Sequence, residues 1–175
     1  MTSSPSEVVV RDAHPEERDT LLELTLSAYA QYAAIMAPAA WESLRDAIHS
    51  ALSADSDAQR IVAVRGRSIL GSVLLFPPLS NAYFGIGKPP QWPEIRLLAV
   101  TPEARGLGIG KQLLAECVRR ANQTGALAIG LHTSSSMREA IRLYQQAGFS
   151  RDPGSDIHLE GAELIEAYRL TLPPA

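Results

Sequence analysis

The stretch RGLGIGKQLL, Arg105 to Leu114, decides the fold of this chain because it joins a strand to a helix through a glycine-rich turn. It follows EIRLLAV, Glu94 to Val100, an apolar run that predicts a buried strand. The glycines of the turn leave backbone amides uncovered at the beginning of the helix. A helix N-terminus carries unpaired N–H groups and a partial positive charge, and it therefore binds phosphate groups well. The turn predicts a site for a ligand that carries a pyrophosphate.

Two common phosphate-binding motifs do not fit this turn. A Walker turn, G-x-x-x-x-G-K-[ST], fails because position 105 is arginine and position 112 is glutamine. A dinucleotide fingerprint, G-x-G-x-x-G, fails because leucine stands at position 113 after Gly108 and Gly110. A different class of pyrophosphate ligand is therefore expected.

The pattern R-x-x-G-x-G at Arg105, Gly108 and Gly110 resembles the acyl-CoA-binding turn of the GCN5-related N-acetyltransferase (GNAT) family. A second block, MREAIRLYQQAGF from Met137 to Phe149, is similar to a later helix of that family, which ends in A-x-x-L-Y-x-x-x-G-F. The two blocks stand in the family's order, and with the flanking strands the resemblance covers about Val8 to Leu172. One position departs from the family, since many members carry asparagine where this chain has Met137.

The resemblance implies an α/β (α+β) fold. It consists of a mixed, largely antiparallel sheet of six to seven strands, with helices on both faces and a splayed central parallel pair. A single domain over residues 1–175 is expected. Acetyl-CoA is the implied co-substrate, and its pantetheine arm would pair with backbone in the strand before the turn. The implied cofactor-binding residues are Leu98, Ala99, Val100, Arg105, Gly106, Leu107, Gly108, Ile109, Gly110 and Lys111.

Two residues are candidates for the proton transfers of acetyl transfer. Tyr144 belongs to the L-Y pair whose tyrosine, in this family, usually points at the cofactor sulfur, and a phenol stays protonated at neutral pH. It is the candidate proton donor to the leaving thiolate. Glu94 starts the strand before the turn, where histone-type members of the family carry a general-base glutamate. It is the candidate base, and a chain of water molecules is the alternative.

Other candidate groups carry weaker signals. His132 ends a predicted strand and titrates in the right range, but a structural role is the simpler interpretation. Cys117 is the only cysteine and lies in an apolar helical stripe, so it is expected in the core. No metal site is expected, because His14, His49 and His158 show no ligand spacing and the chain has a single cysteine. Aromatic residues including Tyr83, Phe84 and Trp92 are candidates for an acceptor pocket.

The hydrophobic pattern also predicts the individual elements. Strands are expected over 8–11, 59–65, 68–76, 94–100 and 126–132, and a final antiparallel pair over 157–159 and 164–172. Helices are expected from Pro15 to about Ile35, over 40–52 and over 108–123. A helix that ends at Gly148 is expected to begin with a capping box formed by Ser136 and Glu139.

Composition limits the partners and the location. The net charge of -3 argues against binding to nucleic acid or to an anionic membrane, because both need a concentrated basic surface. No apolar run has the length of a membrane span, and the first residues lack a signal-peptide pattern, so a cytoplasmic location is expected. A homodimer is a possible assembly.

The sequence therefore predicts an acetyl-CoA-dependent N-acyltransferase. It would move an acetyl group to a primary amine of a small molecule or peptide by direct transfer in a ternary complex. The alternative is a non-catalytic acyl-CoA-binding sensor or subunit. Glu94 and Tyr144 favour the enzyme, because a protein that only binds acyl-CoA needs neither of them.

Overall fold

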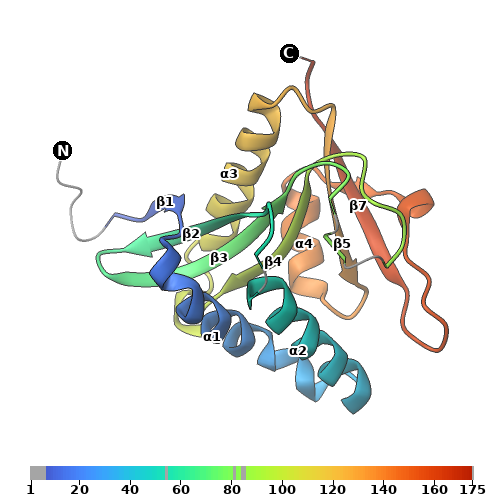
Figure 1. Cartoon of the computed structure of the whole chain (residues 1–175), viewed down its shortest axis with the longest axis horizontal. Coiled ribbons are helices and arrows are strands. Elements are labelled where there is room, and N and C mark those ends of the chain that lie inside the picture. The colour runs from blue at the N-terminus through green and yellow to red at the C-terminus, as the bar shows by residue number, and fades with distance from the viewer. Residues whose placement is uncertain (1–6, 54, 81, 84–85, 175) are drawn as a thin grey trace. The chain divides into compact units, whose positions relative to one another are not determined.

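A computed structural model of the chain describes residues 7–53, 55–80, 82–83 and 86–174. The strands form a mixed sheet of seven strands in the order β1-β2-β3-β4-β5-β7-β6 (Figure 1). Their bounds are β1 Val9–Asp12, β2 Gln59–Arg65, β3 Ser68–Phe76, β4 Glu94–Val100, β5 Ala128–Ser134, β6 Ser150–Arg151 and β7 Ile165–Thr171. The helices are α1 Arg18–Tyr29, α2 Pro38–Ser53, α3 Ile109–Gln123 and α4 Arg138–Gln146. This architecture confirms the predicted fold class.

The chain divides into two compact units. The first unit comprises Met1–Leu74 and Leu97–Glu116, and the second comprises Leu75–Arg96 and Cys117–Ala175. The predicted phosphate-binding turn belongs to the first unit. Glu94, His132 and Tyr144 belong to the second unit.

The first unit is built on the hairpin of β2 and β3, and β1 lies beside β2. β1 pairs with β2 in antiparallel register from Val9↔Val64 to Asp12↔Ile61, and Gly66, at φ 60°, makes the turn between β2 and β3. Leu21 of α1 packs against Val62 and Val64, which share a face of β2. Figure 1 shows α1 and α2 side by side in front of the strands of this unit, with the beginning of α3 behind them. Each face of these strands is thus covered by a helix.

The second unit contains a parallel pair and an antiparallel pair. β4 pairs with β5 in parallel through Glu94↔Gly130 and Ile95↔Leu131. β7 pairs with β5 in antiparallel register along its whole length, from Ala128↔Thr171 to Ser134↔Ile165, and with β6 on its other side. The last strand of the chain therefore lies between β5 and β6.

Several local predictions differ from the structure. The predicted capping box is wrong, because Met137 is the N-cap of α4, and the Ser136 hydroxyl instead hydrogen-bonds Ser134 and Glu163. The strand expected at 157–159 is reduced to one antiparallel bridge between Ile157 and Ile165. The two-residue strand β6 was not predicted, because such a short polar segment has no periodicity to read.

Candidate active site

The most unusual group in the second unit is the carboxylate of Glu94, which is 1% exposed at the beginning of β4. The Tyr83 hydroxyl donates a hydrogen bond to its Oε1 over 2.7 Å. His132 Nδ1 lies 2.5 Å from the same oxygen. A charged carboxylate is costly to bury unless it is hydrogen-bonded and paired, and these two side chains satisfy both conditions.

The register of the parallel pair brings Glu94 and His132 together. Glu94 is paired with Gly130, and His132 follows two residues later on the same face of β5. Gly130 also makes room for the carboxylate, because a Cβ at this position would lie 2.9 Å from Glu94 Oε2 and 3.2 Å from Trp92 Cδ1. The two oxygens thus have different surroundings: Oε1 accepts from side chains, and Oε2 lies over the bare backbone of Gly130.

His132 is held at both ring nitrogens. Its Nε2 lies 2.8 Å from the carbonyl oxygen of Ser155. A carbonyl oxygen can only accept, so Nε2 must carry a proton. Nδ1 is then the atom whose protonation changes the charge of the ring, and it faces Glu94. The Ser155 carbonyl therefore selects the tautomer and aims the titrating nitrogen at the carboxylate.

Electrostatics favour the charged form of this histidine. Burial of the imidazole lowers its pKa, but the hydrogen bond and the negative charge of Glu94 more than offset this, with smaller contributions from the Ser155 carbonyl and Asp156. The net result is a pKa of His132 above its ordinary value of 6.5. For Tyr83, burial and the adjacent Glu94 charge raise the pKa well above 10.0. Tyr83 thus remains a neutral hydrogen-bond donor at physiological pH.

The segment before β4 is anchored beside this group. Arg96 Nη1 donates to the Ala82 carbonyl over 2.8 Å, and its guanidinium lies 5.0 Å from the centre of the Tyr83 ring. Tyr83 in turn contacts the His132 ring edge-on, with 5.0 Å between centroids. Tyr83, expected among acceptor-pocket aromatics, is therefore a partner of the candidate base. Phe84 lies outside the described residues.

Tyr144 is a buried residue of α4, 7% exposed, and its ring packs against Phe149 with 6.2 Å between centroids. The Phe149 amide donates to the Tyr144 carbonyl over 3.0 Å, which closes the end of the helix. The A-x-x-L-Y-x-x-x-G-F block therefore forms one packed helix end. The role of Tyr144 as proton donor stays a prediction.

The glycine-rich turn has the backbone conformation that its sequence suggests. Gly106 and Gly108 both have φ 77°, a region that side chains rarely adopt, and a Cβ at either position would have no neighbour within 4 Å. The Gln112 amide donates to the Gly108 carbonyl, so the amides just before Gln112 form the open end of α3. Arg105 Nη2 donates to the Ala28 carbonyl over 3.1 Å, which ties the turn to the end of α1.

The strand before the turn contains an irregular residue. Leu97 has φ 55°, which is uncommon for a side chain as large as leucine and interrupts the alternation of β4. Ala99, beyond it, is buried against Leu24 and Ala28 of α1. The regular backbone of β4 is therefore interrupted at Leu97. Pairing of this strand with a pantetheine arm stays a prediction.

Within the described part of the chain, no group of three or more His, Cys, Asp or Glu side chains is arranged to hold a metal ion. Cys117 is buried, as its apolar stripe predicted. No helix among the described residues has the length and apolar character needed to cross a membrane.

Comparison with known proteins identifies the family. The sequence model of the Acetyltransferase (GNAT) family matches residues 20–149, which include both Glu94 and the glycine-rich turn. The chain belongs to this family. Among curated members, the mycothiol acetyltransferase of Arthrobacter sp. (strain FB24) is 36% identical over 67 residues, which are 38% of this chain and 21% of that protein. The match thus spans about a fifth of the length of that relative.

Two further proteins are similar to this chain, one in sequence and one in structure. The aminoalkylphosphonate N-acetyltransferase of Salmonella typhimurium is 41% identical over 58 residues, which are 33% of this chain and 38% of that protein. The PaiA N-acetyltransferase from Thermoplasma acidophilum, solved in complex with coenzyme A, has a TM-score of 0.66 at 21% identity. That superposition covers 92% of this chain and 98% of the other, and it confirms the fold.

Sequence reasoning missed two parts of this site. Glu94 was singled out, but Tyr83 was assigned to a pocket wall and His132 to a structural role. The sequence contained both residues, a glutamate at the start of one predicted strand and a histidine at the end of another, but only the staggered register of the parallel pair, Glu94↔Gly130, makes them neighbours. The room that the Glu94 carboxylate occupies depends on Gly130, and no sequence motif marks this glycine.

Proposed function

We propose that this chain transfers the acetyl group of acetyl-CoA to a primary amine by direct transfer in a ternary complex. The observation that carries the proposal is the buried Tyr83–Glu94–His132 group, because a protein that only binds acyl-CoA has no use for a desolvated carboxylate paired with histidine. Family membership and a neighbour solved with coenzyme A support the choice of co-substrate. We assign the pyrophosphate to the turn Arg105–Lys111, whose open amides suit an anion.

In this proposal the residues of the second unit handle protons. The ammonium form of an amine has no lone pair, so the acceptor must lose a proton before its nitrogen attacks the thioester carbonyl. Glu94 would take up that proton, directly or through water, with Tyr83 and His132 holding the carboxylate in place. As the carbon–sulfur bond breaks, the departing thiolate would receive a proton from the Tyr144 hydroxyl. The co-substrate itself supplies the activated acetyl group.

The acceptor is proposed at the level of chemical class, as a primary amine of a small molecule or peptide. One relative is named an aminoalkylphosphonate N-acetyltransferase, and others are named mycothiol acetyltransferases. Aminoalkylphosphonates therefore belong in the set to be tested, together with peptides that have free N-termini. A cytoplasmic location, a single domain and a homodimer remain predictions.

The decisive experiment measures thiol release from acetyl-CoA with pooled primary amines, followed by mass spectrometry of any product. Amine-dependent release by the natural chain and its loss in Glu94→Gln are the expected results. The matched control is Glu166→Gln, which removes another carboxylate of the second unit that accepts a tyrosine hydroxyl, from Tyr168 over 3.2 Å. Binding of acetyl-CoA without turnover across the whole amine set would contradict the proposal and favour a non-catalytic binding module.

A further inference from the structure

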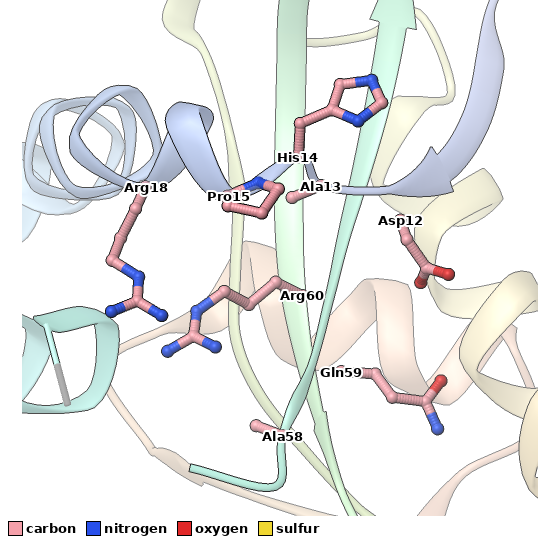
Figure 2. Close-up of a pocket in the computed structure, with 8 residues that line it drawn as sticks. All are labelled: Asp12, Ala13, His14, Pro15, Arg18, Ala58, Gln59 and Arg60. Atoms are coloured by element: carbon pink, nitrogen blue, oxygen red, sulfur yellow. The ribbon is translucent and has the colours of Figure 1, made fainter. Parts of the chain in front are cut away.

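A pocket of about 340 Å³ lies in the first unit, where β1 leads into α1 and β2 begins (Figure 2). Its arginine side chains are engaged within the chain, since Asp55 lies 3.0 Å from Arg18 and its negative charge also acts to raise the pKa of Arg60. Asp12 and Gln59, which line the pocket as well, also interact with other groups of the chain. These side chains therefore need no ligand to balance them.

In the second unit, the carbonyl that binds His132 comes from an exposed turn. Ser155 ends the turn η4, Pro153–Ser155, whose three residues are all exposed, yet its carbonyl oxygen lies 2.8 Å from His132 Nε2. Exposed segments with few buried apolar contacts open locally at little cost in free energy. A hydrogen bond that fixes the protonation of a buried histidine therefore needs a turn that is anchored from elsewhere.

Asp156, the residue that follows this turn, provides the anchor. Its carboxylate accepts from both terminal nitrogens of the Arg151 guanidinium, over 2.6 Å to Oδ1 and 2.8 Å to Oδ2. Oδ1 also accepts from the Ala167 amide over 2.8 Å. Two parallel bonds to an arginine fix the orientation of a carboxylate as well as its distance. The side chain of Asp156 is only 6% exposed, so water competes little for these bonds.

Ala167 connects this anchor to the histidine. It is paired with His132 in the antiparallel register of β5 and β7. Its carbonyl oxygen accepts from the Asp152 amide and from Arg151 Nη1, each over 2.9 Å, and its amide donates to Asp156. The backbone of the residue opposite His132 thus binds the chain on both sides of the turn. The position of the turn relative to the imidazole is therefore set by the β5–β7 register and by the Asp156 carboxylate.

The charge of Asp156 supports the same arrangement. Hydrogen bonds from the Arg151 guanidinium hold the pKa of the Asp156 carboxyl below its ordinary value of 3.8, so Asp156 stays ionised while the imidazole titrates. Burial lowers the pKa of His132, but Glu94 and, more weakly, the charge of Asp156 raise it. Glu94, Tyr83 and Asp156 are the titratable side chains beside this imidazole.

We propose that Asp156 is a positioning residue of the candidate active site. Held by Arg151, it keeps the Ser155 carbonyl on Nε2 of His132. Nδ1, which faces Glu94, is then the nitrogen that titrates. The inference rests on the proposed function only for its effect on the reaction rate, because the choice of tautomer is a property of the protein without substrate.

The test follows the nitrogen-15 signals of the His132 ring by NMR from pH 5.5 to 9, without substrate. In the natural chain Nε2 should stay protonated throughout, and Nδ1 should titrate. In Asp156→Asn the turn loses its charged anchor and Nε2 loses its acceptor, whereas a proton on Nδ1 still has the Glu94 carboxylate as a partner. We therefore expect the titrating nitrogen to change from Nδ1 to Nε2 and the pKa of His132 to fall.

Three further variants separate this role from general stability. Glu17→Gln breaks a matched ion pair of the first unit, in which Arg11 donates two bonds of 2.8 and 2.9 Å and is 31% exposed, as Arg151 is. Gly154→Ala alters the turn but none of its anchors, since the added methyl group would lie 4.0 Å from its nearest neighbour. Neither variant should change the titrating nitrogen. Arg151→Lys keeps the charge but loses the two parallel bonds, so it should give a mixture of both tautomers, and it replaces Asp156→Asn should that variant not fold.

Activity gives a separate measurement. With an active amine, Asp156→Asn should lower kcat roughly tenfold or more and leave KM for acetyl-CoA nearly unchanged, because a displaced base slows the reaction without weakening binding. An unchanged titrating nitrogen in Asp156→Asn, an equal change in Glu17→Gln, or a natural kcat after the nitrogen has switched would each overturn the inference. Absence of turnover in the natural chain would instead overturn the proposed function, and the ring titration would still decide the role of Asp156.

Discussion

Nδ1 of His132 lies 2.5 Å from Oε1 of Glu94, and the two side chains are 9% and 2% exposed. Glu94 on β4 is paired with Gly130 on β5, and His132 lies two residues after Gly130. The contact therefore runs diagonally between the two strands. A buried carboxylate and a protonated imidazole in such a position form an ion pair. Variants at these two positions separate the contribution of the pair to catalysis from its contribution to stability.

Replacing Glu94 by glutamine should slow acetyl transfer about 10²-fold near neutral pH, the usual range for loss of a general base. The amide keeps the shape and can still accept from Tyr83. Raising the pH should restore part of the rate, because more of the acceptor amine is then unprotonated. The measurement is kcat/KM against pH for both proteins. Superimposable profiles would show that Glu94 takes no part in proton transfer.

The pair should stabilise the fold in a pH-dependent way. The pKa of His132 is raised in the folded state, so its stabilising contribution is complete below the unfolded pKa of 6.5 and is lost as pH rises through the folded value. Each pH unit by which the folded pKa of His132 exceeds the unfolded pKa adds about 1.4 kcal/mol to the free energy of unfolding at low pH. Urea unfolding from pH 5.5 to 9 should show a higher free energy of unfolding for the natural chain than for His132→Asn. This difference should shrink as the pH rises across that interval.

An NMR titration of His132 gives an independent check. We expect a pKa above 6.5 in the natural chain and a lower one in Glu94→Gln, where burial is no longer offset by a carboxylate. A constant stability difference across the pH range, together with an unshifted imidazole, would contradict the ion pair.

Gly130→Ala should move Glu94 without changing its chemistry. The new methyl group would lie 2.9 Å from Oε2, closer than real contacts allow, so the carboxylate or the strand must shift. We expect kcat to fall at least tenfold with little change in affinity for coenzyme A. Gly154→Ala is the matched control, since its methyl group would come no closer than 4.0 Å to a neighbour. Equal activity of the two variants would show that the position of Oε2 is not critical.

Tyr144→Phe should lower turnover about 10²-fold and leave coenzyme A affinity nearly unchanged, if its hydroxyl protonates the thiolate. The ring that packs on Phe149 is retained, so the fold should persist. Tyr168→Phe removes a hydroxyl from another buried tyrosine of the second unit and should remain active. Turnover at the natural rate in Tyr144→Phe would assign this residue to packing alone.

Gly108→Val should weaken coenzyme A binding by more than tenfold, or about 1.4 kcal/mol. A side chain would cover the amides of the turn and would also strain a backbone at φ 77°. Gly66→Val separates the two effects, because Gly66 also has positive φ and open surroundings but lies in the β2–β3 turn. Calorimetry should show weaker binding in the first variant only. Unchanged affinity in a folded Gly108→Val would remove the basis for placing the pyrophosphate at this turn.

The strands were predicted best where turn residues mark their ends. β2, β3 and β4 begin and end at the predicted residues, because Gly66 marks the hairpin and a proline-rich segment isolates Glu94–Val100. The start of α4 was placed on the wrong residue, because an S-x-x-E pattern does not reveal that Glu163, far along the chain, competes for the Ser136 hydroxyl. Local motifs cannot report such long-range partners.

The candidate site was predictable only in part for the same reason. Glu94 stood out through the family resemblance, but its two partners lie 11 and 38 residues away in sequence. The distance between Glu94 and His132 depends on the register of two parallel strands, and a shift of one residue would turn the histidine to the opposite face. Hydrophobic periodicity predicts that strands exist, but it does not fix how they align.

The place of β7 between β5 and β6 affects how the protein can be made in the cell. During translation, β5 and β6 emerge first, and the gap between them can be filled only after residues 165–171 have left the ribosome. Until then the apolar β5 presents an open edge, the kind of surface that pairs with other chains. The sheet of the second unit is therefore expected to close only after residues 165–171 have emerged, and a nascent chain that pauses before residue 165 is expected to need chaperone protection from aggregation.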